Sequence, residues 1–159
     1  MNDQKLGTVG EGAVKISAHD RPAFMDPEKL PWTPWVMEGT HYKLMTVDAR
    51  SGGFTMFLKV DPGTVAPAHG HVGAVEGVIL EGGFAYDDDA GSKGDYICEH
   101  AGAIHKPVSP EGCIMFAIAH GPLVGYNEDG SIAAVVDAKF MLEMARAAGV
   151  ADHIDTQYI

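Results

Sequence analysis

The stretch Gly63–Gly83, GTVAPAHGHVGAVEGVILEGG, decides the fold. It places His69 and His71 two residues apart and Glu76 a few residues further on. Residues i and i+2 of a strand point to the same face, about 6–7 Å apart along the chain. Two imidazoles on one face can share a metal ion, and a carboxylate can join them as a further ligand. Another histidine, His105, lies downstream in Gly94–Ser109, GDYICEHAGAIHKPVS.

These two segments resemble the two signature motifs of the cupin family. The first motif, G-x5-H-x-H-x4-E-x6-G, is matched by Gly63, His69, His71, Glu76 and Gly83. The second motif, G-x5-P-x-G-x2-H-x3-N, is matched by Gly94, Gly102 and His105, with His100 at the proline position and Ser109 at the asparagine position. Both departures fall at turn positions and leave the candidate ligands unchanged. The resemblance implies an all-β fold, the cupin double-stranded β-helix or jelly-roll barrel.

Composition narrows the class of partner. The chain has 159 residues, which suits one domain, and a formal net charge of -11. This charge argues against nucleic acid and against an anionic membrane, since both require basic patches. No run approaches the ~18 apolar residues of a membrane span, and the first residues lack the apolar core of a signal peptide. With only two cysteines, Cys98 and Cys113, we expect a cytoplasmic protein with reduced thiols.

The pattern of turns and alternating residues predicts three regions: an N-terminal arm (1–38), a barrel (39–136), and a short helix with a tail (137–159). Residues 1–20 are expected to form a loose arm or an edge strand. Strands are predicted at 41–47, 54–60, 75–80, 84–86, 96–99, 113–119, 123–126 and 131–136, with a hairpin turn at 81–83. The helix is predicted to begin after Asp137 and end at Gly149, with Phe140, Met141, Met144 and Ala148 on its apolar stripe.

The candidate metal ligands are three neutral nitrogen donors, His69, His71 and His105, with Glu76 as an oxygen donor or as a hydrogen-bonding group beside the ligands. Imidazole suits iron, zinc, copper or nickel, and a carboxylate shifts the preference toward iron and manganese. No cysteine stands at ligand spacing, which argues against a structural thiolate zinc site.

A narrower resemblance extends over residues 30–145. The segments LPWTPW (30–35) and HGPLVGYNEDGSIAAVVDA (120–138) are similar to those of small cupin dioxygenases, including 2,4'-dihydroxyacetophenone dioxygenase and the acetylacetone-cleaving enzyme. This resemblance implies a non-haem Fe(II) on His69, His71 and His105, with Zn, Mn or Ni as alternatives. It also implies O2-dependent cleavage of a carbon–carbon bond beside a carbonyl group, with both oxygen atoms entering the products. Glu76 is the expected catalytic carboxylate.

The expected partners are a small carbonyl substrate, such as a β-diketone or a hydroxyacetophenone, O2, and a second copy of the chain in a homodimer. The expected pocket residues are Phe54, Met56, Met115, Phe116 and His120. Trp32 and Trp35 are expected to pack the arm against the barrel, or to reach the mouth of a pocket or a second subunit. Two other functions remain open: a metal-dependent isomerase, lyase or hydrolase, and a metal-binding sensor domain like those of zinc-containing anti-sigma factors.

Overall fold

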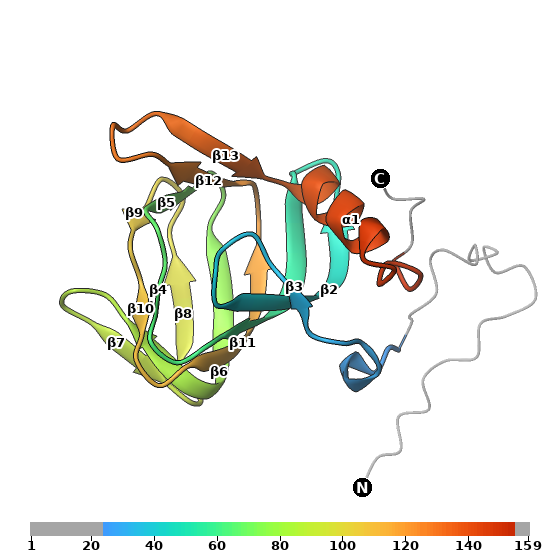
Figure 1. Ribbon diagram of the computed structural model, residues 1–159, viewed down its shortest axis with the longest axis horizontal. Helices are drawn as coiled ribbons and strands as arrows, with labels where there is room; N and C mark the ends of the chain where they lie inside the picture. Colours follow the sequence, from blue (N-terminus) through green and yellow to red (C-terminus); the bar gives the residue numbers. More distant parts are fainter. Residues whose placement is uncertain (1–23, 155–159) are drawn as a thin grey trace, which may run out of the picture.

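The computed structural model describes residues 24–154, in which two curled β-sheets enclose a barrel and one helix packs beside it (Figure 1). The arm or edge strand expected at residues 1–20 lies outside the described residues. The strands are β1 (Thr33–Pro34), β2 (Thr40–Asp48), β3 (Gly53–Val60), β4 (Thr64–Val65), β5 (His69–His71), β6 (Val75–Ala85), β7 (Ala90–Ser92), β8 (Tyr96–Glu99), β9 (Ile104–His105), β10 (Val108–Ser109), β11 (Cys113–Ala119), β12 (Leu123–Tyr126) and β13 (Ile132–Val136). The all-β fold class is confirmed.

The larger sheet has the strand order β1-β2-β3-β11-β6-β10-β4, and β7 and β8 also pair with β6. The smaller sheet has the order β13-β12-β5-β9 and carries all three candidate histidines. In β11, every second residue from Cys113 to Ala119 is buried, and the residues between them are half-buried. This alternation gives the barrel an apolar inner wall, to which β3 contributes Phe54 and Met56.

The predicted hairpin turn at 81–83 is wrong, because β6 continues through these residues to Ala85. Residues 75–82 pair with β11 and residues 75–78 also with β8, whereas residues 83–85 pair with β7 and β10. Gly82 makes this possible: its φ is +63°, and a Cβ atom there would lie 2.0 Å from the Gly112 carbonyl oxygen. The register against β11 also shifts between Ile114 and Met115, so the double glycine bends the strand instead of reversing it.

Helix α1 (Ala138–Ala147) begins as predicted, since the Asp137 side chain accepts a hydrogen bond from the Phe140 backbone N–H at 2.8 Å. Its buried residues are Ala138, Met141, Leu142 and Ala145. They pack on the core that includes Tyr42 and Leu44 of β2. The predicted apolar stripe is therefore displaced, because Phe140 is 37% exposed. Among the described residues, no helix has the length and apolar character needed to cross a membrane.

Candidate metal centre

The three histidines come together because β5 and β9 are antiparallel neighbours in the smaller sheet. His69 lies directly opposite His105 in the register of this pair, and His71 follows on the same face of β5. His71 is 5% exposed, whereas His69 and His105 are half-buried. Among the described residues, these three form the group whose ligand atoms all lie within 4.8 Å of one another. The structure thus brings together the nitrogen donors named from the sequence.

The donor atoms converge on one point. The Nε2 atoms of His71 and His105 are 2.8 Å apart, and those of His105 and His69 are 3.1 Å apart. An ion about 2.0–2.1 Å from each imidazole nitrogen would hold two donors about 2.9 Å apart at a right angle and about 3.4 Å apart at a tetrahedral angle. The two separations are short enough for the nitrogens to share one ion.

The tautomer of His69 also suits metal binding. Its Nδ1 lies 3.0 Å from the Pro67 carbonyl oxygen, and this contact requires the proton on Nδ1. The Nε2 lone pair of neutral His69 therefore faces the other two rings. In His71 the opposite nitrogen, Nδ1, is buried and has no hydrogen-bond partner within the described part of the chain.

Electrostatics keep the three rings neutral. Burial, reinforced by the neighbouring rings of His105 and His69, lowers the pKa of His71 to about 3. Burial and the proximity of His69 lower the pKa of His105 to about 4, and burial also lowers the pKa of His69. Neutral imidazoles offer lone pairs, which is the form that a metal ion requires. The donor set therefore fits a divalent cation of the transition series.

Glu99, which sequence reasoning missed, is the carboxylate beside this cluster. Its Oε2 lies 3.3 Å from His71 Nε2, and its Oε1 lies 3.4 Å from His105 Nε2. The side chain is 12% exposed, and burial raises the pKa of Glu99 to about 7. The Tyr86 hydroxyl donates a hydrogen bond to Glu99 Oε1, and the Tyr86 ring stacks on His105 with centroids 4.9 Å apart.

Glu76 lies on the opposite, outer face of β6. Its neighbour Val75 points into the core, so Glu76 must point outward. The Glu76 carboxylate accepts hydrogen bonds from the Tyr96 hydroxyl and, at 2.6 Å, from His120 Nε2. The structure therefore does not place Glu76 where it could bind an ion held by the histidines. Glu99, in contrast, pairs with Val75 across the sheet and shares its inward orientation.

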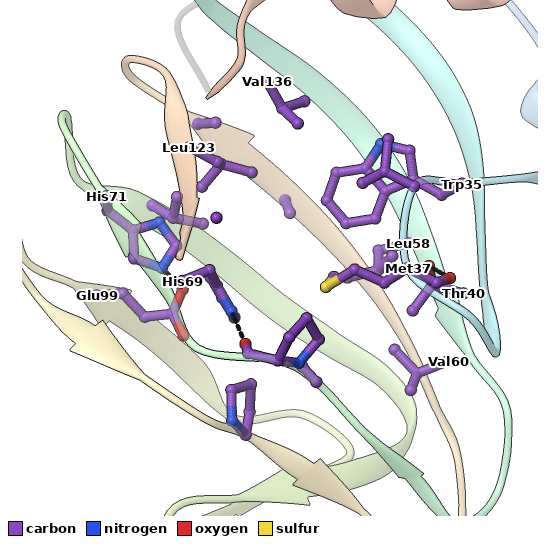
Figure 2. Close-up of a pocket in the computed structure, with 18 of the residues that line it drawn as sticks. Trp35, Met37, Thr40, Leu58, Val60, His69, His71, Glu99, Leu123 and Val136 are labelled. Atoms are coloured by element: carbon purple, nitrogen blue, oxygen red, sulfur yellow. Dashed lines mark hydrogen bonds and ion pairs between the residues drawn. The ribbon is translucent and has the colours of Figure 1, made fainter. Parts of the chain in front are cut away.

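A cavity of about 340 Å³ lies inside the barrel, next to the candidate metal centre. His69, His71 and Glu99 line one side of it, and Trp35 and Met37 line the side opposite (Figure 2). Three of the residues expected in a pocket, Phe54, Met56 and Met115, contribute to its wall.

The other two expected pocket residues lie outside the cavity. Phe116 packs on Phe57 on the outer face of the larger sheet, with ring centroids 5.2 Å apart, and His120 pairs with Glu76. The two tryptophans also separate: Trp35 reaches the cavity, whereas the ring of Trp32 lies 4.7 Å from Lys43 Nζ.

Comparison with known proteins identifies relatives of this fold. The sequence profile of the family described as ChrR Cupin-like domain matches residues 20–124. An RmlC-like cupin protein from Ralstonia eutropha is 25% identical, with a TM-score of 0.76 over 85% of this chain and 91% of that chain. An acetylacetone dioxygenase from Acinetobacter johnsonii is 18% identical, with a TM-score of 0.68 over 92% of this chain and 99% of that chain.

A chain in the structure of Rhodobacter sphaeroides SigE in complex with the anti-sigma factor ChrR shares 23% sequence identity with this protein. The TM-score is 0.50, and the match covers 58% of this chain and 49% of that chain. No curated protein sequence gives a significant match.

Proposed function

Because the chain belongs to the ChrR cupin-like family, we propose that it is a metal-dependent cupin dioxygenase that cleaves a carbon–carbon bond of a small carbonyl compound. A β-diketone or a hydroxyacetophenone-like ketone is the substrate that suits it. The observation that carries the proposal is the convergence of three Nε2 atoms, beside a buried carboxylate, at one side of an apolar cavity. An ion held by these histidines would lie next to the space where a substrate fits.

The proposed ligands are His69, His71 and His105, and Glu99, beside them, replaces Glu76 as the proposed catalytic carboxylate. Fe(II) is the proposed ion, and Mn, Ni or Zn are the alternatives, because imidazole nitrogen and carboxylate oxygen suit all of them. Bound there, the ion supplies Lewis acidity and the capacity to react with O2. The short separations between the imidazole nitrogens support one shared ion on these three histidines.

The side chains have separable roles in this proposal. Glu99 accepts the proton from the carbon between two carbonyl groups at Oε2, which faces His71, and leaves an enolate in the cavity. Tyr86 holds the other oxygen, Oε1, through its hydroxyl group and so fixes the direction of the carboxylate. The apolar residues Phe54, Met56 and Met115 hold the substrate and exclude water. The enolate then reacts with O2, the bond beside the carbonyl breaks, and both oxygen atoms enter the products.

The decisive experiment compares oxygen-dependent and oxygen-independent turnover. Fe(II)-loaded protein is assayed in air and under nitrogen against β-diketones and hydroxyacetophenones, with O2 uptake, products and metal content measured on the same sample. Equal amounts of substrate and O2 should be consumed in air, and nothing under nitrogen. Turnover without O2 would instead support an isomerase, lyase or hydrolase. The variant His105→Ala should lose both the metal and the turnover.

The second candidate function is a metal-binding sensor domain without catalysis. The observation that favours it is the family match itself, since ChrR is an anti-sigma factor that binds SigE. Tightly bound zinc, absence of turnover with every ketone, and retention of a sigma factor would support this function. The carboxylate and the cavity beside the histidines favour the enzyme, because a purely structural metal site needs neither.

We also propose that the chain forms a homodimer through the outer face of the larger sheet. An in-register apolar row crosses four strands there, Phe57, Phe116, Val78 and Tyr96, and Val78 and Tyr96 are 38% and 61% exposed. The solvent face of an antiparallel sheet is usually polar, and one such row can pack against its own copy across a twofold axis. Analytical ultracentrifugation should show a dimer for the wild type and a monomer for the Val78→Lys variant.

A further inference from the structure

The cavity wall beyond the histidines offers few polar contacts to a ligand. The hydroxyl groups of its three Ser and Thr residues already donate to backbone carbonyl groups: Thr40 to Met37, Thr64 to Asp61 and Ser109 to Gly83. The remaining hydroxyl group among the lining residues belongs to Tyr126, on the strand that pairs with β5 next to His69. The Trp35 indole N–H donates to Met141 Sδ of α1 at 3.2 Å. The polar groups that can fix the orientation of a ligand are therefore concentrated beside the candidate metal centre.

The charge of the wall restricts the ligand further. Among residues 24–154, those that line the cavity include no Lys, Arg or Asp, and Glu99 is the one acidic residue. A carboxylate, sulfonate or phosphate group at the end of this cavity near Trp35, away from the candidate metal centre, would have no cationic partner there. Burying such a charge without a partner costs several kcal/mol at least, so the wall selects an uncharged group at this end of the ligand.

The size of the cavity exceeds what a minimal diketone needs. Its volume of about 340 Å³ falls within the range of pockets that hold drug-sized ligands, about 300–1,000 Å³. A substrate whose carbonyl groups lie beside His69 and His71 would leave the space toward Trp35 and Met37 for a further part of the molecule (Figure 2). Apolar walls favour an alkyl or aryl group in this space.

Trp35 is held firmly on the far side. Its backbone N–H donates to the Thr40 carbonyl at 2.9 Å, and the Thr40 N–H donates to the Met37 carbonyl at 3.1 Å, so the segment forms a closed turn. The indole is fixed independently by its contact with Met141. A wall residue anchored at both its backbone and its ring can limit the length of whatever occupies the cavity.

We infer that the substrate is a carbonyl compound with an uncharged, apolar arm, and that Trp35 determines specificity by packing against the end of that arm. The inference that the substrate carries a carbonyl group rests on the proposed function. The apolar arm and the role of Trp35 rest on the cavity alone.

The test measures binding by calorimetry under nitrogen, so that no turnover occurs. The probes are 2,4-pentanedione, 2,4-heptanedione and 2,4-nonanedione, with 6,8-dioxononanoate as the charged analogue of the longest, and the protein is loaded with Fe(II). The Kd should fall about fourfold for each added CH2 until the arm reaches Trp35. The charged analogue should bind at least tenfold more weakly than 2,4-nonanedione.

Variants assign the effect to one residue. Trp35→Ala should weaken binding of 2,4-nonanedione about tenfold and change the Kd of 2,4-pentanedione less than twofold. The arm length that gives the tightest binding should increase. Trp35→Phe should restore most of the affinity, which separates packing from a folding defect. Trp32→Ala is the matched control, because Trp32 lies outside the cavity, and it should leave the whole series unchanged.

The outcomes separate this inference from the proposed function. Binding that depends on arm length and changes in Trp35→Ala, with no O2 uptake for any ketone in air, would support the inference and reject the dioxygenase. O2 uptake with Kd values independent of arm length, or equal affinity for the charged analogue, would overturn the inference and leave the dioxygenase standing.

Discussion

Replacing Glu99 and Glu76 with glutamine, one at a time, tests which of these two carboxylates serves the metal centre. In Glu99→Gln the new amide keeps an oxygen that can accept from Tyr86, so the fold should survive. Its NH2 group, however, would face His71 Nε2, where Glu99 Oε2 now lies at 3.3 Å, and would donate to the lone pair that the ion needs. Loss of such a partner typically costs 10–100-fold in metal affinity or activity, about 1.4–2.7 kcal/mol.

Glu76→Gln is the matched control, because it makes the same chemical change on the other side of the sheet. The Glu76 side chain is 40% exposed, and its partners Tyr96 and His120 can also bond to an amide. Its effect on stability should stay within about 0.5 kcal/mol, with metal content and turnover unchanged. The assays are iron content after gel filtration, O2 uptake with 2,4-pentanedione, and urea unfolding. Loss of iron in Glu76→Gln, with full iron in Glu99→Gln, would refute the assignment.

Three further measurements address other parts of the structure. At a free-ion concentration 100-fold above Kd, Fe(II) or Ni(II) should stabilise the protein by about 2.7 kcal/mol, a Tm increase of roughly 5–10 °C that a chelator reverses and His105→Ala abolishes. Gly82→Ala should destabilise by about 2–5 kcal/mol in urea unfolding, because it adds a backbone clash to the strain of a positive φ, whereas Gly94→Ala, with φ +95° and open space around it, should cost about 1–2 kcal/mol. Burial raises the pKa of the Cys113 thiol to about 11, so a thiol reagent at pH 8 should modify half-buried Cys98 in the native protein and Cys113 only in urea. Since the folded pKa of Cys113 lies above its ordinary value of 9.0, its ionisation should destabilise the protein as the pH rises from about 9 to 11.

The strands were predictable where side chains alternate without interruption. The expected 54–60 and 123–126 coincide closely with β3 and β12, and the Asp-Gly turn at 129–130 joins β12 to β13. The prediction failed at 81–83, because a double glycine suits both a reversal and a bend. The bend forms because the Gly112 carbonyl group, thirty residues further along the chain, packs closely against Gly82. A close contact of this kind depends on tertiary packing, which local sequence does not contain.

The site shows the same limit. Three histidines could be named from spacing because His69 and His71 share a short strand and His105 belongs to a second motif. The orientation of Glu76 could not be predicted, because residues 72–74 leave the strand between His71 and Val75 and interrupt the alternation of side chains. Only the pairing of Val75 with Glu99, and of Glu76 with Cys98, shows which carboxylate faces the ion.

One register therefore sets both the walls of the cavity and the charge beside the metal centre. Val75, Met115 and Met56 point inward from three adjacent strands, and Glu99 joins them because it lies opposite Val75. A shift of one residue in the pairing of β8 with β6 would turn Glu99 outward and place Cys98 in its position, without altering the histidines on β5 and β9. The metal ligands and the carboxylate are thus positioned by different strand pairs. A chain of this fold can keep its histidines and still lose the acid–base group.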